Sequence, residues 1–498
     1  MSVALEDRMK LFKKYLDFSG MEHKPYQYEG VQWCVQNETR TDSPIIKGGF
    51  IADEMGLGKT ILMIGTFIAH FVPKTLVVVP VVLLDQWYQQ IYKTTGHKAV
   101  IYHGVNRWKL NLDSAIIVIT TYDMIAFPSK NGNKNKNGKE KSLRKNLLHL
   151  TSWDRVVFDE GHHLRNKKTL IYSGAMLLKS SIRWIVSGTP VQNKKQDFYH
   201  LCGVLGMSPS FYENFSEIQH HYILKRTKKQ IGMNISDVSI NHQMVDWKNK
   251  GEKELSQTIH SYLSFSNIPT NLKHSYINSA MNDNLNHLVM IMKARQCCIL
   301  PRLIASAGAS ATAGAGANVN KNKKMREALA GSSKMDSVIE KLLERKNNGN
   351  GKLVFCHFKE EIDELHRRLI SQGFLEVQIF DGRLNLNKRK EILLSNSEVL
   401  ILQIQTGCEG LNLQENYSEI YFVSPHWNPA IEDQAIARCH RIGQKKQVEV
   451  YKFTMASFIE EEDSSDSSDN EELEKFSLDA YVNSVQDKKR IIASEMFV

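Results

Sequence analysis

Cysteine is scarce in this chain: seven of the 498 residues are cysteines, and no two of them form a C-x-x-C pair. A disulfide framework and a zinc ribbon or RING-type site both need paired cysteines at short spacing, so the sequence argues against both. We therefore expect reduced and mostly buried thiols.

Long apolar runs are missing as well. The longest, Leu76 to Leu84, is interrupted by Pro80 and is far shorter than the ~20 apolar residues that a membrane-spanning helix needs. The N-terminal residues MSVALEDRMKLFKKYLDF carry charges in the first turns and lack the apolar stretch of a secretory signal. We expect a protein that stays inside the cell and has no membrane partner.

Charge is distributed unevenly along the chain. The formal net charge is +10, yet residues 460–474 contain nine acidic residues and no basic one. The rest of the chain has 64 basic against 45 acidic residues, a formal charge of +19, which suits a polyanionic partner such as nucleic acid. Charge alone leaves a lysine-rich, solvated surface without a nucleic-acid role equally open.

Short β-rich runs alternate with segments of helical length. In the first half these runs are TLVVVP, AIIVITTY, RVVFDE and RWIVSGTP, and in the second half they are KLVFCHF, VLILQ and EIYFVSP. Short, continuous apolar strands predict parallel sheets that are covered on both faces. The expected fold class is therefore α/β, with two tandem doubly wound parallel-sheet domains and a helical connecting region.

Three stretches of biased composition help to divide the chain. Residues 130–145 form a basic loop, residues 305–324 form a linker nearly free of large apolar side chains, and residues 460–474 form the acidic, serine-rich segment. The expected parts are an N-terminal extension (1–21), a first domain (22–205), a helical connecting region with the flexible linker (206–330), a second domain (331–456) and an acidic C-terminal tail (457–498).

The strongest local signal is GFIADEMGLGKT, which ends at Thr60. A strand-like start leads into a glycine-rich turn and then a helix, so the backbone N–H groups and the helix N-terminus converge and can cradle a phosphate. Lys59 would neutralise β- and γ-phosphate oxygens, and the hydroxyl of Thr60 would bind Mg²⁺. The strict phosphate-loop pattern is broken at its first glycine, where this chain has Asp53.

The second signal is RVVFDEGHH, an apolar strand that ends in Asp159 and Glu160. An acidic pair at the carboxyl end of a strand can hold hydrated Mg²⁺ with Asp159 and orient the attacking water with Glu160. A solvated strand end would explain the pair taken alone. The phosphate loop upstream on the same expected sheet favours the catalytic interpretation.

These motifs resemble a known family. DEMGLGKT, DEGHH, SGTPVQN at 187–193 and WNPAIEDQAIARCHRIGQ at 427–444 resemble the Swi/Snf-type ATPases of helicase superfamily 2, over most of residues 22–456. Asp53 in place of the first glycine is itself the form of that family. The strings DEGHHLRN and RQCC are most similar to the branch that includes helicase-like transcription factor and transcription termination factor 2. The resemblance implies two RecA-like domains with ATP and Mg²⁺ as cofactors.

The resemblance also implies roles for individual residues of the ATP site. The catalytic residues would be Lys59, Asp159, Glu160, Arg438 and Arg441, with Thr60 and Asp159 as metal ligands. The nucleotide contacts would be Gln27, Asp53, Glu54, Met55, Gly56, Leu57, Gly58, Lys59, Thr60 and Gln434. Coupling to domain motion would involve His162, Ser187, Gly188 and Thr189. The two arginines would reach the γ-phosphate from the second domain when the domains close, although the R-x-x-R spacing alone fits surface ion pairs equally well.

The nucleic-acid contacts implied by the resemblance lie in both domains. They are Pro80, Gln86, Trp87, Thr120, Thr121, Gly410, Asn412, Leu413, Trp427 and Asn428. Contacts of this kind reach phosphates and carry little sequence information. The residues alone favour core packing for Trp33, Trp87, Trp153 and Trp184, because each lies beside an apolar strand or helix. The segment LKRTKKQIG at 224–232 is similar to the basic brace of the family, whose arginine would support the closed state.

Residues and resemblance together predict a DNA-dependent ATPase that translocates on double-stranded DNA and displaces or remodels bound protein. Expected partners are duplex DNA and either histones or an RNA polymerase complex. The chain would act as a monomer in the nucleus, or at a cytoplasmic replication site if it is viral. A strand-separating helicase and a non-catalytic DNA-binding scaffold remain alternatives. The acidic segment would compete for the DNA-binding surface or recruit a basic partner such as histones.

Overall fold

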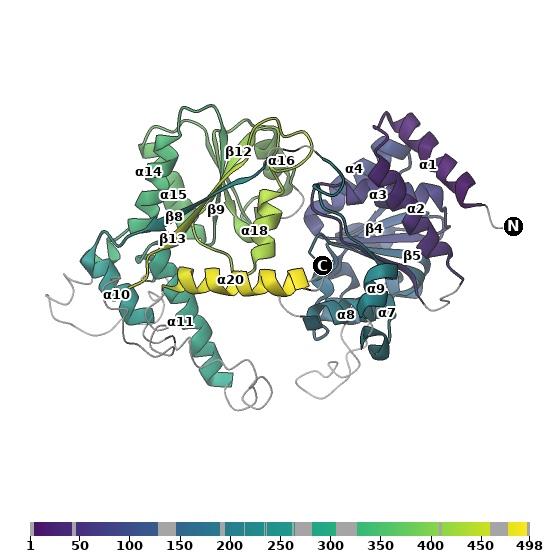
Figure 1. Ribbon diagram of the computed structural model, residues 1–498, viewed down its shortest axis with the longest axis horizontal. Coiled ribbons are helices and arrows are strands. Elements are labelled where there is room, and N and C mark those ends of the chain that lie inside the picture. The colour runs from purple at the N-terminus through teal and green to yellow at the C-terminus, as the bar shows by residue number, and fades with distance from the viewer. Residues whose placement is uncertain are drawn as a thin grey trace. The chain divides into compact units, whose positions relative to one another are not determined.

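The computed structural model of the chain forms two compact units, Met1–Ile235 with Ile491–Val498, and Ser236–Arg490 (Figure 1). The residues that the structure describes are 4–41, 46–127, 146–189, 195–213, 215–233, 235, 237–260, 263, 281–304, 326–407, 411–458 and 477–495. The basic loop, the flexible linker and the acidic segment that the sequence indicates lie outside these residues.

Unit 1 is built on a seven-stranded sheet in the order β3-β4-β2-β5-β6-β1-β7, and every pairing in it is parallel. Its strands are β1 (Lys47–Ile51), β2 (Thr75–Val79), β3 (Val100–Tyr102), β4 (Ile117–Thr121), β5 (Ser152–Asp159), β6 (Lys179–Val186) and β7 (Ile223–Leu224). Its main helices are α1 (Leu5–Ser19), α2 (Pro25–Thr39), α3 (Lys59–Ala69), α4 (Leu84–Thr95), α7 (Leu170–Leu177), α8 (Lys195–Leu205) and α9 (Phe215–Tyr222).

Helices cover both faces of this sheet (Figure 1). Alternate residues of a strand point to opposite faces, and β2 illustrates the result: Leu76 and Val78 join one core cluster, whereas Val77 and Val79 join the other. Phe12 of α1 belongs to the second cluster, so the N-terminal extension contributes to the core of unit 1. Burial on both faces explains why the strands read as continuous apolar runs.

Unit 2 contains a six-stranded sheet in the order β10-β11-β9-β12-β13-β8, again with only parallel pairings. Its strands are β8 (Ser239–Val245), β9 (Gly351–Cys356), β10 (Val377–Phe380), β11 (Val399–Gln403), β12 (Tyr417–Phe422) and β13 (Glu449–Met455). Its main helices are α10 (Lys250–His260), α11 (Met281–Ile299), α14 (Ser333–Glu344), α15 (Lys359–Ser371), α16 (Leu386–Leu394), α18 (Pro429–Ile436) and α20 (Leu478–Glu495), of which residues 478–490 belong to unit 2. The expected fold class, two parallel α/β domains, is confirmed.

Two elements extend unit 2 beyond the expected second domain. β8 comes from the segment expected to be a helical connecting region, yet it pairs with β13 along its whole length. α20 comes from the expected tail, and its residues Leu478 and Val482 are buried in the core. The Nζ of Lys334 forms a buried ion pair with Asp479, which anchors the start of α20.

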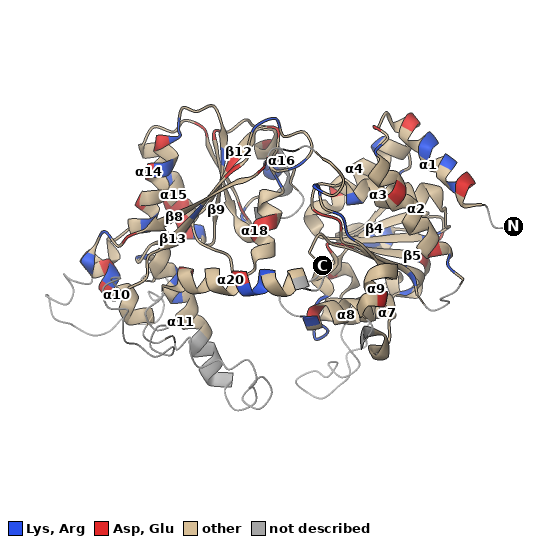
Figure 2. Ribbon diagram, in the orientation of Figure 1, with Lys and Arg blue, Asp and Glu red and all other residues tan. Residues whose placement is uncertain are grey.

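The composition-based expectations can be compared with the described residues. Six cysteines, all except Cys408, are described there, and all six are free and buried. The same residues include no helix long and apolar enough to cross a membrane and no group of three or more His, Cys, Asp or Glu placed to hold a metal ion. Figure 2 shows Lys and Arg interspersed with Asp and Glu along the ribbons of both units.

Candidate active site

Three motif segments leave the sheet of unit 1 at the carboxyl ends of neighbouring strands. β1 leads into the phosphate loop, β5 ends at Asp159, and β6 leads into Ser187. The register pairs Val186 with Ile51 on one side and with Asp159 on the other, so the segments start at the same level. Ligands of open parallel sheets bind at this edge. The fold thus brings together motifs that are far apart in the sequence.

The phosphate loop depends on two glycines. Gly56 and Gly58 have φ angles of 91° and 81°, in the left-handed region that favours glycine. Gly58 is also the N-cap of α3, and a Cβ there would lie 2.8 Å from Nε2 of Gln27. The loop therefore ends at a helix N-terminus that has no side-chain cap, an arrangement that can bind phosphate.

Lys59 begins α3 and turns back towards the loop. Its Nζ donates to the carbonyl oxygens of Asp53, at 2.9 Å, and Glu54, at 3.4 Å. A Cβ on Gly188 would lie 3.3 Å from this Nζ and 2.9 Å from Cγ of Met55. The segment after β6 therefore packs directly on the phosphate loop. Thr60 follows in the first turn of α3 and is half-buried.

Asp53 has a structural partner that accounts for its place in the loop. Arg226 donates to its buried carboxylate twice, from Nε at 3.0 Å and from Nη2 at 2.5 Å, and Nη1 donates to the carbonyl oxygen of Tyr26. The neighbouring Glu54 accepts from the N–H of Lys228 at 2.8 Å and pairs with its Nζ at 3.1 Å. The basic segment that contains Arg226 and Lys228 thus anchors the loop within unit 1.

Asp159 is buried, and hydrogen bonds fix both its carboxylate and its backbone. The indole N–H of Trp87 donates to Oδ2 at 2.6 Å, the N–H of Glu160 donates to Oδ1 at 3.0 Å, and the hydroxyl of Tyr122 donates to the carbonyl oxygen at 2.7 Å. Burial raises the pKa of Asp159 to about 7 and the Glu160 carboxylate adds to the rise, while Trp87 and Lys59 act in the opposite direction. A bound cation would also lower this pKa.

Glu160 adopts a strained backbone conformation. Its φ of 51° is the one positive value among the non-glycine residues that the structure describes, and this region costs such residues about 1–2 kcal/mol. Its Oε2 lies 3.3 Å from Nδ1 of His162, which lies 3.4 Å from Oγ of Ser187. That Oγ accepts from the N–H of Thr189 at 3.3 Å. The residues expected to couple the site to motion therefore form a continuous set of contacts.

The residues expected at the base of the nucleotide lie on α2. Gln27 and Tyr26 are both buried, and the hydroxyl of Tyr26 donates to the carbonyl oxygen of Leu57 at 3.3 Å. Gln27 lies beside Gly58, as the close approach of its Nε2 shows. Helix α2 therefore packs against the last residues of the phosphate loop.

In unit 2, α18 carries the other half of the predicted site. Gln434 is fully buried, and its Nε2 and Oε1 have no hydrogen-bond partner within the described part of the chain. After the helix, the guanidinium of Arg441 donates to Oδ1 of Asn412, and the N–H of Leu413 donates to the carbonyl oxygen of Arg438 at 3.2 Å. Burial lowers the pKa of Arg441 to about 10, with a further contribution from the charge of Arg438.

The remaining predicted DNA contacts of unit 2 have local partners. The ring of Trp427 lies 6.0 Å from the guanidinium carbon of Arg295 and 6.0 Å from the ring of Tyr481. Oδ1 of Asn428 accepts from the N–H of Ala430 at 3.2 Å and caps α18. Gly410 lies outside the described residues. Trp427 and Asn428 thus also have roles in the local structure.

The predicted DNA contacts of unit 1 lie near the ends of β2 and β4. Pro80, Thr120 and Thr121 are buried, and Gln86 is half-buried. The hydroxyl of Thr120 donates to the carbonyl oxygen of Tyr102 at 2.8 Å, which stabilises the pairing of β4 with β3. The hydroxyl of Thr121 lies 3.4 Å from Nδ1 of His103, so both threonine side chains already have partners within unit 1.

The tryptophans follow the expectation that rests on the residues alone. Trp87 is 1% exposed, Trp153 is 3% exposed and Trp184 is fully buried, so core packing is confirmed for these three, while Trp33 is half-buried. The indole N–H of Trp87 is already bonded to Asp159. The DNA contact that the resemblance implies for Trp87 would require its ring to leave this position.

Comparison with known proteins identifies the family. The model of the SNF2-related domain matches residues 26–264, and the model of the helicase conserved C-terminal domain matches residues 333–443. Together they cover most of the chain. The chain is an SNF2-family ATPase of helicase superfamily 2.

Similar proteins differ in how much of their length this SNF2-family ATPase covers. It is 26% identical to a protein named probable global transactivator, from Orgyia pseudotsugata multicapsid polyhedrosis virus, over 95% of this chain and 91% of that protein. It is 27% identical to the ISWI chromatin-remodeling complex ATPase ISW2 of Saccharomyces cerevisiae, over 88% of this chain but 39% of the yeast protein. The Sulfolobus solfataricus SWI2/SNF2 ATPase core in complex with dsDNA is 22% identical, with a TM-score of 0.39, and the match covers 87% of this chain and 88% of that one.

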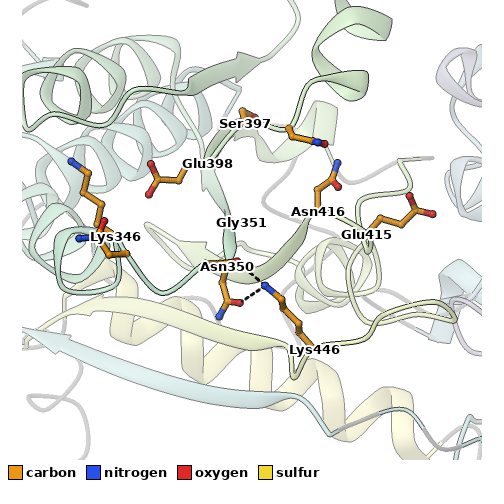
Figure 3. A pocket seen from close by; sticks show the side chains of 11 residues that line it. Lys346, Asn350, Gly351, Ser397, Glu398, Glu415, Asn416 and Lys446 are labelled. Carbon is orange, nitrogen blue, oxygen red and sulfur yellow. Dashed lines mark hydrogen bonds between the residues drawn. The ribbon is translucent and has the colours of Figure 1, made fainter.

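A cavity of about 600 Å³ lies elsewhere in unit 2 of this SNF2-family ATPase (Figure 3). The side chain of Lys446 lines part of it, and its Nζ donates to the carbonyl oxygen of Gly349 at 2.6 Å and to Oδ1 of Asn350 at 2.9 Å. Gly351 in its wall begins β9, so the cavity lies at the amino ends of the strands. The motif residues instead follow carboxyl ends, as Trp427 does after β12, and the cavity is therefore separate from them.

Sequence reasoning did not connect two aromatic residues with the acidic pair. The sequence predicts core packing or a DNA contact for Trp87 and assigns no role to Tyr122, yet both donate to Asp159. The sequence does contain a signal for both residues. Trp and Tyr side chains have a polar tip that needs a hydrogen-bond partner when buried, and each of the two follows a strand whose carboxyl end is already assigned to the site. The bond of Arg226 to Asp53 links positions that no local pattern connects.

Proposed function

We propose that this SNF2-family ATPase is stimulated by DNA, translocates along double-stranded DNA and displaces or remodels protein bound there. The convergence of the glycine-rich loop, Asp159 with Glu160, and Ser187 at one sheet edge supports the proposal, since these segments start at the same level of the sheet and Asp159 is buried there while Glu160 is half-buried. Membership of the SNF2 family supports the coupling of hydrolysis to DNA.

The residues at this edge fit ATP and Mg²⁺. The glycine conformations leave room for phosphate at the loop, and the hydroxyl of Thr60 with the carboxylate of Asp159 offers the oxygen ligands that Mg²⁺ prefers. When bound, the ion would neutralise charge on the phosphate oxygens. We assign Lys59 to the phosphates, Glu160 to orientation of the attacking water, and Gln27 to the nucleotide base.

We assign the second half of the ATP site to Gln434, Arg438 and Arg441. A buried amide without partners is rare in proteins and calls for an explanation, and a ligand that meets Gln434 would provide one. Guanidinium groups suit the charge that develops on a transferred phosphoryl group. This assignment follows the motif of the family.

The proposed DNA contacts divide by exposure. Asn412 is exposed and Gln86 is half-buried, so their side chains can donate to phosphate oxygens. Pro80, Thr120 and Leu413 are buried, Pro80 has no N–H, and the N–H of Leu413 is already bonded to Arg438. We therefore propose that these three residues shape the DNA-binding surface and do not donate to phosphate. Binding of this kind would depend little on DNA sequence and strongly on salt.

We further propose that the chain belongs to the branch that includes helicase-like transcription factor and transcription termination factor 2. The strings DEGHHLRN and RQCC support this placement. Chromatin or a transcription complex is the proposed target, with histones or an RNA polymerase complex as partners. The names of the similar viral transactivator and yeast chromatin-remodeling ATPase support this target. The proposed location is the nucleus, or a viral replication site.

Phosphate release with and without duplex DNA tests the proposal. We expect stimulation by DNA, its loss in Lys59→Ala, and unchanged rates in Lys93→Ala, which removes an exposed lysine from α4. Displacement of a third strand from an intact duplex would then report translocation. Unwinding of forked duplexes without displacement on intact duplex would favour a strand-separating helicase. An absence of hydrolysis under both conditions would favour a DNA-binding scaffold.

A further inference from the structure

Two aromatic side chains converge on Asp159 from neighbouring segments of unit 1. Trp87 lies on α4, which follows β2 by a single short turn, and Tyr122 directly follows β4. β2 pairs with β4 on one side and with β5, which carries Asp159, on the other. The two donors therefore approach the acidic pair from adjacent strand ends.

The bonds that these side chains donate fix two different parts of Asp159. The indole N–H of Trp87 occupies Oδ2 at 2.6 Å and so sets the rotation of the carboxylate. The hydroxyl of Tyr122 bonds the carbonyl oxygen at 2.7 Å and so holds the end of β5. A donor that orients a carboxylate ligand typically changes metal affinity or activity by about 10–100-fold when it is removed.

The same two segments carry the predicted DNA contacts of unit 1. Gln86 immediately precedes Trp87 on α4, and Thr121 immediately precedes Tyr122. A displacement of either segment would therefore move a hydrogen-bond donor of Asp159. The ring of Tyr122 also lies 4.9 Å from the ring of His163, in the 3-10 helix Gly161–Leu164 that follows Glu160. The contacts thus reach Asp159 and the segment that follows the acidic pair.

We propose that Trp87 and Tyr122 are positioning residues that link the DNA-contacting ends of β2 and β4 to Asp159, so that DNA binding adjusts the carboxylate and with it the rate of hydrolysis. This inference rests on the proposed function, because it assumes that DNA meets these two segments. In this proposal, Trp87 affects hydrolysis by orienting Asp159 and does not contact DNA directly.

Core packing alone would not require this bond. A buried indole needs a hydrogen-bond partner, but a backbone carbonyl serves as well, as it does for Trp153, whose N–H donates to the carbonyl oxygen of Leu148 at 2.9 Å. Trp153 lies in the same unit and is similarly buried, at 3% exposed. Trp153→Phe is therefore a matched control for Trp87→Phe, because each variant keeps a large ring and loses one N–H.

The test measures phosphate release by the full chain as a function of duplex DNA and of Mg²⁺, together with DNA affinity without nucleotide. For Trp87→Phe we expect the stimulation by DNA to fall about tenfold and the Mg²⁺ concentration for half-maximal rate to rise about tenfold. DNA affinity should stay within about twofold, because the indole does not contact DNA. Trp153→Phe should leave all three quantities unchanged.

Tyr122→Phe provides a second variant with a smaller change, the loss of one hydroxyl, in case Trp87→Phe does not fold by circular dichroism. We expect reduced stimulation by DNA with retained DNA affinity. Normal stimulation and Mg²⁺ dependence in folded variants would overturn the inference. A loss of DNA affinity in Trp87→Phe would instead assign Trp87 to direct contact. Wild-type chain that hydrolyses ATP without any response to DNA would refute the proposed function itself, which separates the two failures.

Discussion

Removal of Arg226 should destabilise unit 1, because the buried carboxylate of Asp53 would lose its partner and would not be solvated by water. Arg226 donates twice to Asp53, whose side chain is 2% exposed, and once to the carbonyl oxygen of Tyr26. Breaking a buried ion pair from one side costs about 3–5 kcal/mol, because the other charge remains. Since a domain is stable by only about 5–15 kcal/mol, Arg226→Met should take away a large part of the stability of unit 1.

Urea unfolding followed by tryptophan fluorescence suits this measurement. Five of the seven tryptophans, all except Trp247 and Trp427, lie in unit 1. The double variant, Asp53→Asn with Arg226→Met, should lose about 2 kcal/mol less free energy of unfolding than the two single variants lose in sum, because it buries no unpaired charge. ATP affinity should fall in Arg226→Met, since Asp53 and Lys59 share the phosphate loop.

A solvent-exposed ion pair in the same unit provides the control. Lys10 and Asp7 pair at 2.9 Å with side chains 60% and 58% exposed, so Lys10→Met should change the free energy of unfolding by less than about 1 kcal/mol. The reasoning would be refuted if Arg226→Met cost no more than this control. Strict additivity in the double variant would also show that the two side chains do not act as a pair.

Four further predictions concern single positions. Gly58→Ala should weaken ATP binding, measured by fluorescent nucleotide titration, because its φ of 81° and the nearby Gln27 oppose a Cβ. Arg155→Met should lower the urea stability of unit 1 by about 3–5 kcal/mol, since Glu38 would keep a buried charge without its bidentate partner. Burial alone would raise the pKa of Glu364, but hydrogen bonds from three arginines lower it to about 2. The pKa of this group is higher in the unfolded chain, so ionised Glu364 stabilises the fold above about pH 4.5. This contribution to the free energy of unfolding is lost as pH falls towards 2. Glu364→Gln should therefore show a smaller loss of stability than wild type in urea unfolding across that interval. Gln434→Leu should raise the stability of unit 2 by about 1–3 kcal/mol in calorimetry and lower the ATPase rate, because it removes a buried amide that has no partner.

Local patterns were sufficient for the elements and for the phosphate loop. The apolar run at 155–160 corresponds to the end of β5 and the one residue that follows it. The glycine-rich turn leads into α3, which begins at Lys59. Continuous apolar strands follow directly from burial on both faces, and glycines at positive φ follow from the tight approach at the loop. These features depend on neighbouring residues, and a sequence can therefore reveal them.

Contacts between distant segments could not be read in the same way. Trp87 and Asp159 are 72 positions apart, and Arg226 and Asp53 are 173 positions apart. Which partner a buried tryptophan or arginine takes depends on the order of strands in the sheet, and periodicity does not determine that order. β8 illustrates the same limit, because its pairing with β13 decides its unit, whereas its position in the chain suggested a connecting region.

Three features that cost stability lie in the motifs. Glu160 has a strained backbone, Gln434 buries an amide without partners among the described residues, and Arg441 has a lowered pKa beside Arg438. Among the described residues, other buried polar atoms without a hydrogen-bond partner lie outside the motifs, for example Nδ2 of Asn37 and the hydroxyl of Ser418. The indoles of Trp153 and Trp184, in contrast, donate to an oxygen acceptor. Each of these three features costs stability, as features of residues that serve a function often do. Under the proposed function, a polyphosphate would supply acceptors for the amide of Gln434 and countercharge for the guanidinium groups of Arg438 and Arg441, so nucleotide binding would offset two of the three costs.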